Sequence, residues 1–510
     1  MRGGLLAAAC VAALVAAGAA HGETLRDALV QTYNTNPTIM GQRAQVRSLD
    51  ENVAIARAAR RPQISGVAGV NQNIYSSRAG FGSGRNVNLG VDVSYPIFEG
   101  GRTRNRIIAA DERVAAGRAS LRATEGDIFT EAVSVYMDVI RDRSIVGLNQ
   151  NQVRVLETNL RATRDRFEVG DLTRTDVAQS EARLALAQSN LATAQGRLRS
   201  SEEAYRRVIG ELPEDLQPPP PLPLLPATPD QAVDVALANN PDLISIAAQI
   251  RASGRDISVA EADRLPTVSG VAQGDYTNYL GTADSQFGGV GNANSSANSA
   301  VGVQARIPIY QGGIVGARVR QAQAVRSQLL ERGIETERFV VANTRAAFAI
   351  YRAAQEAIES NTVAVAANTL ALEGTRAEQT VGTRNVLDVL NAEQELLNSE
   401  VALVSARRDA YVAGFQLLNA MGRAEAEDLN LDGGALYDPV ANYTRVSRRA
   451  SDWDEDDAPQ AVSTRTVTGP AAETPIEERR QAPTIGTTPT TGSPTTGAPT
   501  TGSGTPQSPQ

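Results

Sequence analysis

Three reactive side chains are almost absent from this sequence of 510 residues. No lysine occurs, so all 49 basic residues are arginines, and the single cysteine and single histidine are Cys10 and His21. These absences exclude most cysteine and histidine nucleophiles, thiolate and imidazole metal sites, the P-loop lysine and lysine Schiff bases. The sequence therefore predicts a protein that is not an enzyme and that needs no metal or other cofactor.

Positive charge and aromatic residues are scarce as well. The formal net charge is −8 at pH 7, which argues against nucleic acid as a partner, because such proteins usually neutralise phosphates with a basic face. Aromatic residues make up 4% of the chain, which is few for an ordinary globular protein of this length. We therefore expect no role in binding nucleic acid, and few kinds of enzymatic mechanism remain possible.

Residues 1–22 have the pattern of a secretory signal peptide. Arg2 is followed by an apolar run from Leu5 to Ala20, and small residues occupy the two positions that signal peptidase reads. The run is too short and too rich in alanine for a good membrane span, and no later segment is long enough for a transmembrane helix. The only cysteine lacks the leucine three positions ahead that a lipidation site needs. The mature chain is predicted to begin near Glu23.

The rest of the chain divides into two copies of one structural unit. Residues 23–216 and 227–446 carry the same motifs in the same order, for example Val169-Gly170 and Val381-Gly382. A register kept over such a distance indicates a duplication. The proline-rich stretch 217–226 is the predicted linker between the copies. Residues 447–510, rich in Thr, Pro and Gly and containing an acidic run, are predicted to form a disordered periplasmic tail.

Each copy contains two segments with the alternation of β-strands. In segment 86–98, valine, leucine and tyrosine alternate with asparagine, glycine, aspartate and serine, which gives one apolar and one polar face. A loop rich in Gly, Ser and Asn separates the two segments, so each copy is predicted to form one hairpin. The predicted strands span about 62–76, 86–98, 266–279 and 297–310. Open strand edges are not tolerated in lipid, so four strands must oligomerise to close a barrel.

After the second strand of each copy the apolar period becomes helical. No proline lies between Pro96 and Pro213 or between Pro308 and Pro439, and both intervals are rich in good helix formers. Apolar residues recur every seven positions, which is typical of helices that pair as coiled coils. The predicted helices span about 102–168, 173–211, 314–380 and 385–422, with a turn at each Val-Gly pair.

The phrases YPIFEGG at 95–101 and IPIYQGG at 307–313 mark the places where a strand gives way to a long helix. Proline cannot donate to a strand ladder, so the prolines are predicted to end the strands. Paired glycines free the backbone to turn from strand to helix. The predicted junction residues are Pro96, Gly100, Gly101, Pro308, Gly312 and Gly313.

Several of these stretches together resemble the TolC family of outer-membrane efflux proteins. They are the FEGG and YQGG junctions, VGDLTRTDVAQSEARLALAQ, VGTRNVLDVLNAEQELLNSE and YDPVANYTRV. The resemblance covers residue 23 to about residue 446. It implies a mainly helical fold with membrane strands, in which a trimer forms one twelve-stranded β-barrel in the Gram-negative outer membrane. A long α-helical barrel then projects into the periplasm.

The function implied by the resemblance is that of a passive exit duct. It would serve a tripartite efflux pump or a type I secretion system, recruited by a periplasmic adaptor protein and an inner-membrane transporter of the ABC or proton-driven type. The family docks the adaptor at its exposed turns, which match Val169, Gly170, Val381 and Gly382 here. The alternative reading of those turns is a plain helix C-cap, for which glycine suffices.

Family members close the periplasmic end of the tunnel with acidic side chains. Asp388 matches the first acidic position, whereas Asn391 occupies the second, so one carboxylate per protomer is kept. Three such charges around one axis repel each other unless cations or an arginine offset them. Without the resemblance, the favoured interpretation of Asp388 is a solvated carboxylate near a helix start, where the helix dipole stabilises it; the resemblance reverses this preference.

The family also holds the closed tip with polar links between helices. Arg384 matches the linking arginine, and Thr175 and Asp176 match its partners on the first copy. Gln379 stands where well-known members have a linking tyrosine. Asp176 is equally compatible with an ordinary role at a helix start.

Two other function classes remain to be compared with the duct. One is a structural coiled-coil protein of the envelope without channel activity, which the signal peptide and the two-faced strands argue against. The other is an enzyme, the poorest of the three because cysteine, histidine and lysine are missing from the mature chain.

Overall fold

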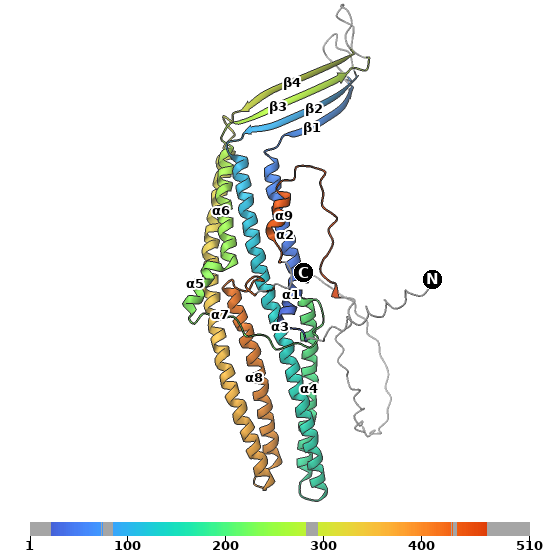
Figure 1. Ribbon diagram of the computed structural model, residues 1–510, viewed down its shortest axis with the longest axis vertical. Coiled ribbons are helices and arrows are strands. Elements are labelled where there is room, and N and C mark those ends of the chain that lie inside the picture. Colours follow the sequence, from blue (N-terminus) through green and yellow to red (C-terminus); the bar gives the residue numbers. More distant parts are fainter. Residues whose placement is uncertain are drawn as a thin grey trace, which may run out of the picture. The chain divides into compact units, whose positions relative to one another are not determined.

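Each half of the chain folds as two short helices, a β-hairpin and two long helices (Figure 1). The structure, a computed structural model, describes residues 22–72, 74, 85–281, 294–429, 431 and 436–466. Residues 1–21 of the predicted signal peptide, the tips of both hairpins and the tail beyond residue 466 lie outside the described residues. The described residues belong to one compact unit, Met1–Ala472.

The two halves have matching elements in the same order. The first half contains α1 (Leu25–Thr35), α2 (Pro37–Ala58), β1 (Gln63–Gln72), β2 (Arg85–Phe98), α3 (Arg102–Glu168) and α4 (Arg174–Ile209). The second half contains α5 (Pro229–Asn239), α6 (Pro241–Ala262), β3 (Thr267–Asn278), β4 (Ser295–Arg306), α7 (Ile314–Thr380) and α8 (Val386–Ala420). A short helix, α9 (Pro439–Val446), follows.

The same asparagine–proline pair organises the start of both halves. Asn36 caps α2 by accepting a bond from the backbone N–H of Thr38, while its amide donates to the carbonyl oxygen of Val208 in α4 at 2.9 Å. In the second half Asn240 caps α6, and its amide donates to the carbonyl oxygen of Ala420 in α8 at 3.1 Å. Proline at the first helical position fixes the backbone for the helix. Each asparagine therefore ties the second short helix of a repeat to the end of its last long helix.

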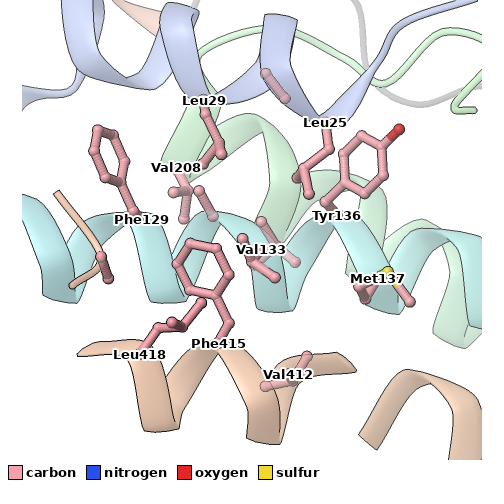
Figure 2. Close-up of a cluster of buried hydrophobic side chains, with 14 of the residues drawn as sticks. Leu25, Leu29, Phe129, Val133, Tyr136, Met137, Val208, Val412, Phe415 and Leu418 are labelled. Carbon is pink, nitrogen blue, oxygen red and sulfur yellow. The ribbon is translucent and has the colours of Figure 1, made fainter. Parts of the chain in front are cut away.

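The long helices pack in pairs. α3 and α7 contain 67 residues each, so each is roughly 100 Å long at 1.5 Å per residue. α3 lies along α4, α7 lies along α8, and α8 also packs on α3. Figure 2 shows the main core, in which Phe129, Val133 and Met137 of α3 lie between α1 on one side and α8 on the other. Among the described residues no helix has both the length and the apolar character that crossing a bilayer requires.

The four strands form one antiparallel sheet in the order β1-β2-β3-β4. The pairing places Ile64 opposite Val93, Val93 opposite Ala272, and Ala272 opposite Val301, so residues of one face continue across all four strands. The neighbouring positions, Ser65, Asp92, Gln273 and Ala300, form the other face. The sheet thus has one mainly apolar and one mainly polar face.

The strand-to-helix junctions differ from the prediction at the prolines. Pro96 does not end its strand: it pairs with Ser269 inside β2, which continues to Phe98 with an irregularity in the register. The pairing of β1 with β2 ends at Ser94, so Pro96 lies where β2 has one partner and a missing N–H is tolerated. In the second half β4 ends at Arg306, two positions before Pro308.

The paired glycines adopt the conformation that the junction needs. Gly100 and Gly101 have φ of 61° and 81°, and Gly312 and Gly313 have φ of 60° and 82°. Gly101 and Gly313 are the residues that cap α3 and α7. Side-chain-bearing residues rarely adopt this left-handed region, so glycine is required for this route from strand to helix.

Residues 447–466, which were predicted to belong to the disordered tail, make defined contacts. The guanidinium of Arg57 donates to the carbonyl oxygen of Ser447 at 3.3 Å, and that of Arg206 donates to the carbonyl oxygen of Thr466 at 2.6 Å. Asp456 of the acidic run pairs with Arg445 and Arg449 at 2.7 Å, and these arginines hold the pKa of its carboxyl well below the usual range. The acidic run is therefore partly neutralised by the chain's own arginines.

Candidate functional site

The candidate site is the tip formed by the two turns that join the long helices, α3 to α4 and α7 to α8. Both turns have the same backbone. Gly170 and Gly382 each have φ of 83°, and each donates its N–H to the carbonyl oxygen three residues earlier, at 2.9 and 3.0 Å. The next residue in each turn closes a second bond, from Asp171 to Arg166 at 2.9 Å and from Thr383 to Glu378 at 3.0 Å. This pair of bonds satisfies the last carbonyl groups of a helix.

The valines of the two turns are open to solvent. Val169 is 81% exposed and Val381 is 73% exposed. An added Cβ on Gly170 or on Gly382 would meet no atom within 4 Å. The four predicted docking residues are thus accessible within one protomer, and φ alone accounts for the glycines.

The start of α4 uses the acidic residue of the first copy for capping. Asp176 accepts bonds from the backbone N–H and the hydroxyl of Thr173 at 2.9 and 2.7 Å, and its own N–H donates to the Thr173 hydroxyl. These bonds lower the pKa of the Asp176 carboxyl. Thr175 is exposed on the same turn. The helix-start role is therefore present for Asp176.

The start of α8 leaves the acidic residue of the second copy outside the cap. Asn385 is the capping residue, and its side-chain oxygen accepts the N–H of Asp388 at 2.8 Å. The Asp388 carboxylate is half-buried and lies 3.9 Å from the guanidinium of Arg384. Its charge thus lies near an arginine and, among the described residues, takes no part in the cap.

The main partner of Arg384 is a residue that sequence reasoning missed. Its Nε donates to the Glu378 carboxylate at 2.8 Å, which raises the pKa of the arginine. Within the described residues of one protomer no hydrogen bond or ion pair joins Arg384 to Thr175 or Asp176. Glu378 lies six positions before Arg384, across the turn, and such a separation gives no helical signal.

The two remaining predicted residues have separate surroundings. Asn391 accepts a bond from the guanidinium of Arg183 in α4 at 2.7 Å, so the position of the missing second carboxylate joins α8 to the first repeat. Gln379 is half-buried at the end of α7, where its carbonyl oxygen accepts the N–H of Gly382. The tip has no group of three or more Asp, Glu, His or Cys arranged to hold a metal among the described residues.

The chain is a duplication that combines a two-faced antiparallel sheet with helical pairs, each containing one helix roughly 100 Å long, an architecture that suits membrane strands with helical extensions. Comparison with known proteins identifies the family. The model of the family described as outer membrane efflux protein matches residues 28–211 and 232–423. The chain therefore belongs to the outer membrane efflux protein family, which confirms the resemblance.

Curated relatives span the folded chain. The chain is 36% identical over 432 residues to the outer membrane efflux protein BepC of Brucella suis, a match that covers 84% of this chain and 91% of the relative. It is 25% identical over 476 residues to the outer membrane protein TolC of Escherichia coli, with 88% and 94% covered. The protein is thus a non-enzymatic efflux channel of the outer membrane.

A solved structure shows the same fold. The Campylobacter jejuni CmeC outer membrane channel matches with a TM-score of 0.70 at 16% identity, and 83% of this chain and 89% of that chain are covered. At this identity the likeness concerns the fold alone. It supports a mostly helical fold with some strands of the channel-tunnel type.

Proposed function

We propose that three copies of this chain assemble into one twelve-stranded barrel and a periplasmic helical tunnel, which together form a passive exit duct. The observation that carries this proposal is the sheet of the single protomer. Among the described residues β1 and β4 each pair on one side only, so the sheet has two open edges. Such edges are not tolerated in lipid unless they pair with those of another copy.

The two faces of the sheet support the same arrangement. Large apolar side chains on one face are exposed in the protomer: Leu89 and Val91 at 51% and 53%, Val301 and Val303 at 89% and 71%. The opposite face carries Ser65, Asp92 and Gln273. A closed barrel would place the first face against lipid and the second around water.

We further propose that the tip is a gate. In a closed trimer three Asp388 carboxylates would approach one axis and repel each other, and Arg384 lies close enough to offset that charge. The pairing of Arg384 with Thr175 or Asp176, if it forms, would join neighbouring copies. The cost of bringing the carboxylates together makes the closed tip responsive to cations.

The partners that fit this duct are a periplasmic adaptor at the exposed turns and an inner-membrane transporter that energises export. A duct has no reactive group that selects a cargo, so the transporter determines whether the pump exports small molecules or protein. A structural envelope protein without a channel remains the alternative. That alternative does not account for a sheet with two open edges and an exposed apolar face.

Single-channel recording in a planar lipid bilayer tests the duct. The purified full-length assembly is expected to conduct, and Asp388→Ala is expected to raise its conductance or to weaken block by divalent cations. If neither the wild type nor Asp388→Ala conducts, the duct is refuted and the structural alternative gains support. The mass of the assembly in detergent tests the trimer independently of conductance.

Adaptor docking is tested by binding to the purified adaptor. Val169→Asp and Val381→Asp, which place a charge on each exposed turn, are expected to weaken binding. Val462→Asp is the matched control, because Val462 is 73% exposed but lies outside the helical pairs. Unchanged binding in both turn variants would contradict docking at the tip.

A further inference from the structure

A buried carboxylate lies near the start of α8, beyond the six residues discussed for the gate. Glu393 is only 3% exposed. Its two carboxylate oxygens accept bonds from the Asn159 side-chain amide at 3.0 and 3.2 Å, and one of them also accepts from the guanidinium of Arg376 at 3.0 Å. A buried carboxylate is tolerated only when its oxygens are bonded in this way.

The three residues of this cluster come from three helices. Asn159 is on α3 in the first repeat, Arg376 is on α7 and Glu393 is on α8 in the second. Leu390, three positions before Glu393, and Leu156, three positions before Asn159, belong to a buried apolar cluster with Ala187, and the three are 2%, 4% and 7% exposed. Charge-assisted bonds are stronger in such surroundings than in water. One side chain thus joins the α7/α8 pair to the α3/α4 pair.

The two partners of Glu393 would respond differently if the helical pairs separated. Arg376 lies on the neighbouring helix of the same pair, and its side chain is 49% exposed. It would move with Glu393 and keep the carboxylate paired. Asn159 would stay with α3, so the Asn159–Glu393 bond is the one that breaks. Because the separated state keeps a partner for the charge, the contact can open and close.

We propose that Glu393 is a positioning residue that holds the α7/α8 pair against α3 when the tip is closed, with Asn159 as its partner. This inference rests on the proposed gated duct. It adds a contact within one protomer to a gate whose other predicted links lie at the turns. The half-buried Gln379 occupies the position at which well-known family members have a linking tyrosine. Another residue of this chain can therefore supply a link between the helical pairs.

An exchange of donor and acceptor tests the contact. Asn159→Asp would place two carboxylates together and is expected to separate the pairs, raising the open probability on the order of tenfold or more. Glu393→Gln removes the charge, keeps the shape and is expected to shift the equilibrium in the same direction by less. Asn159→Asp combined with Glu393→Gln restores a donor facing an acceptor, and is expected to return the open probability towards that of the wild type.

Separation of the helices is measured apart from conductance. Cysteines in place of Val169 and Val381, in a mature chain that is predicted to have no other cysteine, carry spin labels for distance measurement. Labelled full-length chain is mixed with excess unlabelled chain, so that one labelled copy enters each assembly. Asn159→Asp is expected to lengthen or broaden the distance distribution, and the double exchange is expected to restore it.

Glu395→Ala is the matched control on the same helix. Glu395 is exposed, and the bond that it receives from Asn368 goes to its backbone oxygen, which the substitution keeps. It should leave the distance and the open probability unchanged. If distances respond to Asn159→Asp but nothing conducts, the Glu393 contact stands and the duct fails. If the assembly conducts and neither Asn159→Asp nor Glu393→Gln changes the distances, or the double exchange restores nothing, the contact is refuted and the duct stands.

Discussion

The two helical turns of this protein have the same backbone and different electrostatics. Both use glycine at φ of 83° and the same pair of backbone bonds. At the start of α4 the cap is Thr173, and Asp176 completes a capping box with it. At the start of α8 the cap is Asn385, and the Asp388 side chain is left to face Arg384.

The electrostatic difference between the two turns arises at the residue that caps each helix. Both caps accept the N–H of the acid three positions later, but only the threonine hydroxyl also donates to that acid's carboxylate. The acid of the first turn, where the cap is threonine, therefore completes a capping box, whereas the carboxylate of the second turn, where the cap is asparagine, lies 3.9 Å from the guanidinium of Arg384.

The largest expected difference between the copies lies at the strand-to-helix junctions. Gly100-Gly101→Val-Val should abolish assembly, because two residues in the left-handed region cost ~2–4 kcal/mol and a Cβ on Gly100 would lie 2.7 Å from that of Leu265. Gly312-Gly313→Val-Val carries the same backbone strain, but an added Cβ at either glycine would meet no atom within 4 Å. Its yield of assembled protein in detergent should fall less. Normal assembly of the first variant would show that the junction glycines are dispensable.

The next largest effect separates the two acids. Asp388→Ala is expected to change conductance and cation block and to leave thermal unfolding nearly unchanged. Asp176→Ala should lower the free energy of unfolding by about 1 kcal/mol through loss of the capping box, with little effect on block. Bilayer recording and thermal unfolding of both variants check the contrast. Equal changes in block would mean that both acids face the tunnel.

A matched pair of changes should have equal effects. Gly170→Ala and Gly382→Ala each place a Cβ in the left-handed region with open space around it, so each should destabilise the fold by ~1–2 kcal/mol. Denaturant unfolding of the two single variants measures this. A clear difference between them would reveal a contact at one turn that the single protomer lacks.

The smallest change in stability is expected for a substitution that gives the second turn the cap of the first. Asn385→Thr gives α8 the cap of α4, so the Asp388 carboxylate should turn back to accept from the new hydroxyl. Stability should change by no more than about 0.5 kcal/mol, while cation block should move part of the way towards that of Asp388→Ala. Val386→Thr, one position into the helix, is the control. Block that is unchanged by Asn385→Thr would argue that the cap does not orient Asp388.

Much of this protein's fold and family can be derived from sequence because its signals are local or repeated. Helix formers without proline predict the long helices, and strict alternation predicts two-faced strands. The double glycines predict a left-handed backbone conformation at the junctions, since few residues other than glycine adopt it. The prediction failed at Pro96, where the register with β3 allows the strand to pass a residue that local rules place at a strand end. It also failed at residues 447–466, whose order depends on arginines distant in sequence.

The sequence by itself determined the duplication, the family and the positions of the two turns, because repeats, helical periods and glycine conformations are properties of short segments. Only the tertiary structure decided how the polar groups of the tip are paired. Arg384 donates to Glu378, Arg183 donates to Asn391, and Asn159 and Arg376 both donate to Glu393. These partners lie on different helices or across a turn, and charge–charge and hydrogen-bond energies depend on distances in space that sequence spacing does not fix.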